Sequence, residues 1–142
     1  MIPERYASIT YALFRIVFGF LFLCFGLQKL LGWFGGPAAP LVDMRGYAGL
    51  IETVTGLLIM IGLLTKYAAF IASGEMAVAF FYIHVSIVGL GPKGAGLPAA
   101  LLPHFNNGVD ATLFCFAFLY IATRGPGIWS VDSMIAGPPK RV

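Results

Sequence analysis

The stretch TYALFRIVFGFLFLCFGLQKLLGWF, from Thr10 to Phe34, decides the fold class of this protein. It is apolar almost throughout, and it is longer than the roughly 20 residues that cross a hydrocarbon core. Further apolar stretches follow at about 46–64, 67–90 and 109–123, separated by a tight turn or by segments rich in Gly and Pro. The sequence therefore predicts an all-α integral membrane protein, a bundle of four transmembrane helices in a single domain, residues 1–142.

The composition supports this prediction. Of 142 residues, 59% are hydrophobic and 11% are charged, whereas about 25% of residues are charged in ordinary soluble domains. So few polar side chains could not cover the surface of a soluble protein. The net charge of +3 is spread over the predicted helix ends without a basic patch interleaved with aromatic residues, so no nucleic-acid partner is expected.

The basic residues predict the orientation, because cytoplasmic loops carry an excess of Lys and Arg. Four spans place both termini on one side of the membrane, together with the turn between the second and third spans. That side holds six of the nine basic residues, and the other side holds three, namely Lys29, Arg45 and Lys93. Both termini are therefore predicted to be cytoplasmic. The six are Arg5, Arg15, Lys66, Arg124, Lys140 and Arg141.

Four polar side chains are predicted to meet in the outer half of the bundle. At a rise of about 1.5 Å per residue, Lys29 lies roughly 7 Å below the outer end of the first span. Glu52 and His84 each lie about 9 Å below the outer ends of the second and third spans. Asp110 lies at the outer mouth of the fourth span. Ionisable groups within a membrane are candidates for function, so this layer is the candidate site.

Glu52 is predicted to face the interior of the bundle, with Lys29 as its partner. At 100° per residue, Arg45, Gly49, Glu52 and Gly56 form one stripe, and small residues allow a neighbouring helix to approach closely. Arg45 is an alternative partner nearer the surface. A structural pair that fixes helix register, or a Lys29 side chain that extends to the interface, are the alternatives to a working site.

Glu75 is predicted to lie apart from this layer. It is nearer the middle of the third span, closer in depth to Arg15 than to Lys29. Nine residues separate it from His84, which is about 180° around a regular helix, so the two cannot share one site unless the helix is irregular. Glu75 shares its stripe with Tyr82. It is either part of a proton relay or a structural group.

The loop GLPAALLPHFNNG, residues 96–108, is apolar for a loop exposed to water. It is predicted to fold over the outer polar layer as a lid. With nearby aromatic residues it would form a cleft for a hydrophobic ligand that accepts hydrogen bonds, such as a quinone. Alternatively, NNG is only a turn and a helix cap. The aromatic residues are Trp33, Phe34, Phe80, Phe81 and Phe105.

Four blocks of sequence match a known family in order and spacing. They are GLQKLLGWFGG (26–36), AGLIETVTGLLIMIGLLTKYAA (48–69), ASGEMAVAFFYIH (72–84) and GPGIWSVD (125–132). The chain resembles the DoxX family from about Phe14 to Asp132. The resemblance implies a small, multi-pass protein of the bacterial or archaeal cytoplasmic (inner) membrane. The family motif positions fall on Gln28, Lys29, Gly32, Glu52, Gly56, Gly62, Glu75, Met76 and His84.

The family takes its name from a small subunit of a quinone-linked membrane oxidoreductase. The resemblance thus implies a subunit that contributes a quinone site and contacts other redox subunits as well as lipid. An accessory subunit that packs on a larger respiratory or photosynthetic assembly is the first alternative, and a small proton-coupled transporter is the second. The sequence has no metal-ligand spacing and no nucleotide-binding loop, so no intrinsic cofactor or metal is expected. A homo-oligomer is compatible with the sequence.

Overall fold

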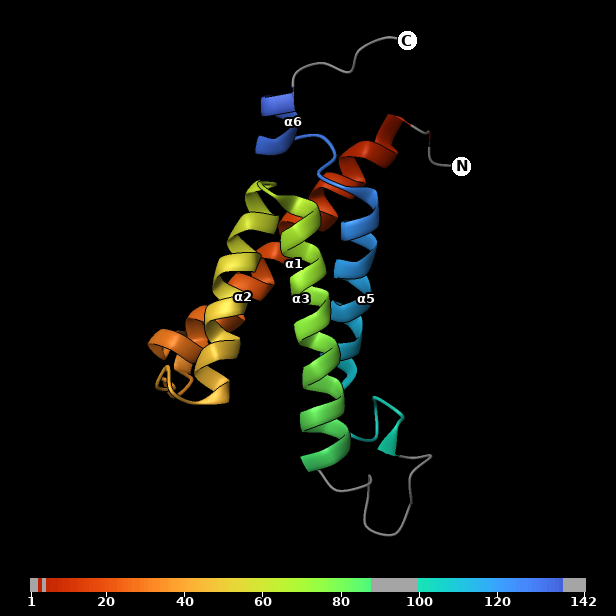
Figure 1. The fold of residues 1–142 in the computed structure, drawn as a ribbon. Coiled ribbons are helices and arrows are strands. Elements are labelled where there is room, and N and C mark those ends of the chain that lie inside the picture. Colours follow the sequence, from red (N-terminus) through yellow and green to blue (C-terminus); the bar gives the residue numbers. More distant parts are fainter. Residues whose placement is uncertain (1–2, 4, 88–99, 137–142) are drawn as a thin grey trace.

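The computed structural model describes residues 3, 5–87 and 100–136, and every regular element in these ranges is a helix. The predicted all-α class is confirmed. The principal helices run side by side as a bundle (Figure 1) and are α1 (Arg5–Leu31), α2 (Met44–Ile61), α3 (Thr65–Ala79) and α5 (Val109–Arg124). Three helical stretches are long and apolar enough to cross a membrane, namely Tyr6–Leu31, Met44–Ile61 and Thr65–Val85. The helix at the fourth predicted span, α5, has 16 residues.

Glycines end the first two helices earlier than the sequence predicted. α1 stops at Leu31 because Gly32 has a φ of 68°, and the chain continues in a short 3-10 turn, Trp33–Gly35. α2 stops at Ile61 because Gly62 has a φ of 73°. This left-handed conformation is the usual way in which a helix ends at glycine. The first two predicted helices, which ended at 34 and 64, were therefore each three residues too long at that end.

α3 continues into a π-helical segment, Phe80–Ile87. The π-helix has wider turns than the α-helix because each N–H bonds five residues back, and such segments are frequent at functional sites. The third predicted span is therefore irregular in its last part. Its predicted end at Leu90 lies outside the described residues.

The helices pack as two pairs. α1 lies mainly against α2, α3 lies mainly against α5, and the α2–α3 contact joins the pairs. The backbones of α1 and α5 lie farther apart, and aromatic side chains fill the space between them, as in the Phe22–Phe114 and Phe22–Phe118 ring pairs. Glycine brings α1 and α2 close together: a Cβ added at Gly56 would lie 2.5 Å from the backbone N of Leu23, and one at Gly49 would lie 2.8 Å from Cβ of Lys29. Gly49, Glu52 and Gly56 are all buried. The predicted small-residue stripe is confirmed.

The surface of the bundle is apolar, and charged residues lie inside it. Phe70, Val78 and Phe116 are each more than 60% exposed, whereas Arg15 and Glu52 are almost fully buried. A large exposed apolar surface is unfavourable in water but is expected where lipid surrounds the protein. This distribution identifies the outer faces of the helices as surfaces that contact lipid.

Arg15 ties one end of the bundle together. Its guanidinium donates hydrogen bonds to the carbonyl oxygens of Ile59 at 2.6 Å, Met60 at 2.8 Å and Trp129 at 2.7 Å. The first two belong to the last turn of α2, where carbonyl groups have no partner within the helix and a cation is favoured. From the sequence, Arg15 was counted among the basic residues that predict the orientation in the membrane. Arg15 is instead a structural clasp between α1, α2 and the segment after α5.

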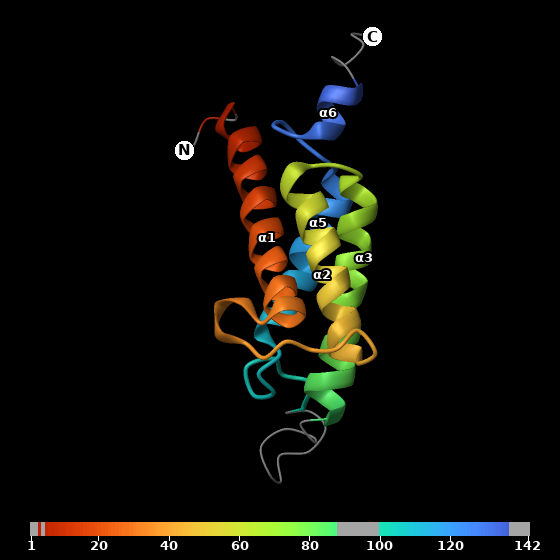
Figure 2. The same cartoon turned by 90° about the vertical axis from the view of Figure 1, so that its left-hand side faces the viewer.

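A second clasp lies at the same end, in a short helix that the sequence did not predict, α6 (Val131–Ala136). The Asp132 carboxylate accepts hydrogen bonds from the backbone N–H groups of Leu64 and Thr65, both at 2.9 Å, and from the Thr65 hydroxyl at 2.7 Å. Burial alone would raise the pKa of Asp132, but these hydrogen bonds outweigh it and hold the pKa below its usual value. The beginning of α1, the α2–α3 turn, the end of α5 and α6 thus lie at one end of the bundle (Figure 2).

Candidate ligand-binding cavity

A cavity of about 240 Å³ lies between the helices at the end of the bundle opposite α6, where α1 ends and α5 begins (Figure 2). α1 supplies Lys29, α2 supplies Glu52, the π-helical segment supplies His84, and α5 supplies Asp110. The structure therefore brings together the four side chains that the sequence placed in one outer layer.

Lys29 and Glu52 form the predicted ion pair. The Lys29 ammonium donates to Oε1 of Glu52. The Glu52 side chain is 2% exposed and that of Lys29 is 25% exposed, so the carboxylate is the more deeply buried partner. Oε2 of Glu52 is buried and has no hydrogen-bond partner. The Lys29 head group is thus held inside by Glu52, which contradicts the alternative of a side chain that simply extends to the interface.

The loop before α5 fixes His84. Its Nδ1 lies 3.1 Å from the backbone carbonyl of Asn106. Because a carbonyl only accepts, Nδ1 carries the proton in this contact, and Nε2 remains able to accept a hydrogen bond. The buried Asn106 amide donates to the Ala100 carbonyl at 2.7 Å, and its oxygen accepts from the Gly108 N–H at 2.7 Å. Asn106 therefore has the turn-forming role that was one of the two predictions for this loop.

The other prediction for the loop, a lid, is tested only in part. Residues 96–99 lie outside the described residues. Asn107 lines the cavity next to Asp110, which lies in the first turn of α5, where the helix dipole favours an acidic side chain. Both are exposed residues. The end of the loop thus reaches the mouth of the cavity.

The aromatic walls of the cavity are not the ones predicted. Phe22 and Phe25 of α1 and Phe114 of α5 line it, with Phe22 and Phe114 buried. Phe22, Phe25 and Lys29 are spaced i, i+3 and i+7, which places them on one face of α1. That spacing could have identified Phe22 and Phe25 as cavity residues from the sequence. The many other Phe residues in the same stretch obscured it.

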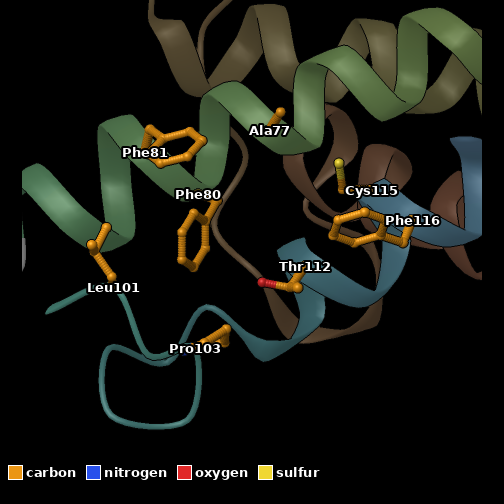
Figure 3. Close-up of a pocket in the computed structure, with 8 residues that line it drawn as sticks. All are labelled: Ala77, Phe80, Phe81, Leu101, Pro103, Thr112, Cys115 and Phe116. Carbon is orange, nitrogen blue, oxygen red and sulfur yellow. The ribbon is translucent and has the colours of Figure 1, made fainter. Parts of the chain in front are cut away.

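Two of the predicted aromatic residues, Phe80 and Phe81, line a separate hollow of about 280 Å³ between α3 and α5 (Figure 3). Leu101 and Pro103 of the loop close its end, and Phe116 lies along α5. This hollow carries no charged side chain and opens on the apolar outer surface. It is therefore an apolar hollow of the outer surface and not part of the polar site.

Glu75 lies close to the pair and far from the depth predicted. It lines a hollow of about 160 Å³ between α2 and α3, together with Tyr82, with which it was predicted to share a stripe. The charges that act on it are those of Glu52 and Lys29, while Arg15 is bound to carbonyl groups at the far end of the bundle. The prediction that Glu75 is closer in depth to Arg15 is wrong, because depth was counted from the outer ends of the spans. Those ends are not level: the third helical stretch continues to Ile87, beyond the level at which α2 begins.

Gln28 does not join the other candidates. A Cβ added at Gly36 would lie 2.5 Å from Cγ of Gln28, so this side chain packs against the turn after α1. It is not among the residues that line the cavity. Its position supports the turn that follows Lys29.

Apolar helices around a buried ion pair and a small polar cavity define a multi-pass membrane protein. The sequence profile of the DoxX family matches residues 10–85, which hold Lys29, Glu52, Glu75 and His84. A Haemophilus influenzae protein described as uncharacterized is 36% identical over 134 residues, covering 92% of this chain and 93% of its own length. The chain belongs to the DoxX family. No solved structure matches it.

Proposed function

We propose that the cavity binds the head group of a quinone, and that the protein acts as a small membrane subunit of a quinone-linked redox complex. The observation that carries the proposal is the cavity itself, in which an ammonium group, an imidazole and two carboxyl groups from four helices meet beneath aromatic side chains. A ligand with an apolar ring and polar oxygen atoms fits that combination.

The chemistry of the lining matches the two ends of such a head group. The carbonyl oxygens of a quinone accept hydrogen bonds, and the Lys29 ammonium is a donor. Nε2 of His84 can accept a hydrogen bond, which suits a hydroxyl group of the reduced quinone. Phe25 and Phe114 offer aromatic faces to the ring, their own rings lying 5.8 Å apart edge to face. These residues reach the cavity from three different elements.

The size of the cavity favours the head group alone. At about 240 Å³ it is below the roughly 300–1,000 Å³ of sites that enclose drug-sized ligands. A long apolar tail would therefore have to leave the cavity.

The membrane arrangement that belongs to this proposal has four spans, with α5 as the fourth. Its 16 residues extend about 24 Å, and it lies alongside α3 (Figure 1). The end of the bundle that carries α6 would face the cytoplasm, across the cytoplasmic membrane of a bacterium or archaeon. A cysteine introduced at Ser133 should then resist a membrane-impermeant thiol reagent in spheroplasts and react after lysis. Reaction in intact spheroplasts would reverse the orientation.

Photolabelling with a short-tailed azidobenzoquinone tests the ligand proposal. In wild-type protein, cross-links should map to peptides that contain Phe25, His84 or Phe114, and an excess of unmodified quinone should prevent them. His84→Ala should weaken this labelling several-fold. Phe116→Ala is the matched control, because it changes the apolar hollow of Figure 3 and leaves the polar cavity intact.

The same experiment decides against the proposal if labelling is confined to the lipid-facing hollow or is equal in the wild type and His84→Ala. The accessory subunit would then be favoured, because the close α1–α2 packing around Glu52 shows how the ion pair could serve register alone. Proton-coupled solute uptake by the protein in liposomes would instead favour the transporter.

A further inference from the structure

Glu52 and Glu75 lie at the same depth in the bundle. The α2–α3 turn reverses the chain, and Glu52 lies nine residues before the end of α2 while Glu75 lies ten residues after the start of α3. At about 1.5 Å per residue these positions are roughly 14 and 15 Å from the turn. The two carboxyl groups therefore face the same level of the α2–α3 contact.

The charges at this level do not balance. Lys29 supplies one positive charge and bonds only Oε1 of Glu52. Oε2 of Glu52 and Oε2 of Glu75 are both buried without a hydrogen-bond partner. Two ionised carboxylates beside one ammonium would leave a net charge of −1 inside the bundle, and an uncompensated buried charge is strongly unfavourable.

Among the residues that the structure describes, no other charged group at this level supplies the missing positive charge. Arg45, on α2, acts on Glu52 but is exposed at the start of its helix. Asp110, on α5, is exposed and would add negative charge. His84 donates through Nδ1 to the loop carbonyl of Asn106, and Tyr82 beside Glu75 offers a hydroxyl group and not a cation. A proton on one carboxyl group is the remaining way to neutralise the cluster.

We propose that Lys29, Glu52 and Glu75 hold one exchangeable proton between them. Glu75 carries the proton while Glu52 is paired with Lys29. In the transfer, the O–H bond breaks at Glu75 and a new O–H bond forms at Oε2 of Glu52, with no electron exchanged. The inference does not depend on which ligand occupies the cavity, because it follows from the charge balance of the three side chains.

The positions of the two carboxyl groups define a path for the proton. Glu52 lines the polar cavity, and Glu75 lines the hollow between α2 and α3. Ala79 and Ile83 line both hollows, so only a thin wall of side chains separates them. The triad thus connects the cavity to the α2–α3 surface, and it could deliver a proton to, or accept one from, whatever binds in the cavity.

Infrared spectroscopy of the reconstituted protein at pH 7 tests the proposal by counting protonated carboxyl groups. The C=O stretch of a protonated, buried carboxyl group is distinct and shifts in D2O. Wild type should show one such band. Glu75→Gln and Glu52→Gln should each show none, because either change leaves one carboxylate opposite Lys29. Lys29→Met should show about twice the wild-type intensity. Asp132→Asn, outside the bundle interior, is the control and should match wild type.

The result for Glu52→Gln is the decisive one. An independent acid at Glu75 would keep its band in Glu52→Gln, and that outcome would overturn the shared proton, as would the absence of any band in wild type. If Lys29→Met fails to fold, labelling of the wild-type protein in membranes with dicyclohexylcarbodiimide, which requires a protonated carboxyl group, replaces it. Labelling at Glu75 or Glu52 is expected, and no labelling at either would contradict the proposal.

Discussion

Replacing Lys29 by Met should destabilise the protein much more than replacing both members of the ion pair. The methionine keeps the apolar stem of the lysine and removes its charge. Glu52, at 2% exposure, cannot reach water and must then take up a proton to stay buried. Keeping a glutamate protonated at pH 7, well above its reference pKa of about 4.3, costs roughly 3–4 kcal/mol at 1.36 kcal/mol per pH unit. This agrees with the 3–5 kcal/mol typical of a broken buried pair.

The other variants should cost less. In Glu52→Gln, Glu75 can give up its proton and balance the charge of Lys29, so the loss should be about 1 kcal/mol. The double variant, Lys29→Met with Glu52→Gln, leaves no unpaired charge in this pair and should also lose about 1 kcal/mol. The double variant should therefore be more stable than Lys29→Met alone by about 2 kcal/mol.

Equilibrium unfolding in mixed micelles, followed by circular dichroism at pH 7 and pH 5, measures these differences. The deficit of Lys29→Met should shrink to about 1 kcal/mol at pH 5, because the cost of protonating Glu52 falls as the pH approaches that of a free glutamate. Equal stabilities of the single and double variants, or a deficit that does not change with pH, would refute the pairing as the source of stability.

Three further predictions concern packing and the two clasps. Gly56→Ala should destabilise the bundle by about 1–3 kcal/mol, because its Cβ would lie 2.5 Å from the backbone of α1; micelle unfolding measures this. Arg15→Lys keeps the charge but loses the planar set of donors that binds carbonyl groups of α2 and Trp129, so we expect a loss of about 2 kcal/mol and faster proteolysis after α5. Asp132→Asn should cost about 1 kcal/mol at pH 7. Because the pKa of Asp132 is lowered in the folded state, that difference should vanish as the pH falls below about 3.9 through the folded value, which an acid titration of both proteins measures.

Each of these has a matched control or a contrary result. Gly74→Ala is the control for Gly56→Ala, because nothing lies within 4 Å of its added Cβ and it should be neutral or slightly stabilising. If both glycine variants behave alike, close α1–α2 packing is not required. If Arg15→Lys is as stable as the wild type, the charge of Arg15 matters and its planar set of donors does not. A stability difference for Asp132→Asn that persists at low pH would exclude its ionised carboxylate as the cap.

The Lys29–Glu52 pair could be predicted because helical periodicity and depth, both readable from sequence, decide which side chains meet. Small residues on the Glu52 stripe indicated which face approaches α1, and the structure confirmed this. Gly32 and Gly62 could have signalled the true helix ends, since glycine in the left-handed conformation ends a helix regardless of the apolar residues that follow it. Apolarity alone does not mark a helix end.

The depth predicted for Glu75 was wrong because the outer ends of the second and third spans do not lie at the same level; the third helical stretch continues to Ile87, beyond the level at which α2 begins. The π-helical segment begins at Phe80, and counting from the far end of a span drawn to Leu90 displaced Glu75 from Glu52. Counting from the tight α2–α3 turn would have placed them together. The position of a tight turn is a better reference for the relative depth of two helices than the outer ends of their apolar stretches. At the outer ends, apolar residues continue into the loops.

Arg15 could not be assigned from sequence because its partners are backbone carbonyl groups, which no residue pattern reveals. Its signal was an arginine within an apolar stretch without an acidic residue at a matching depth. The GPGIWSVD block after the fourth span was the other half of that signal. It holds Trp129, whose carbonyl accepts a hydrogen bond from Arg15, and Asp132, whose carboxylate accepts one from the first residue of α3.

The central claim is that the cavity around Lys29 and His84 holds a membrane-soluble ligand. Native mass spectrometry of the protein, released gently from its own membranes, tests it most directly. We expect the wild type to carry an adduct of quinone mass, alone or within a complex of redox subunits, and His84→Ala to carry much less, while Phe116→Ala retains it. A protein that is bare in all three forms would contradict the claim.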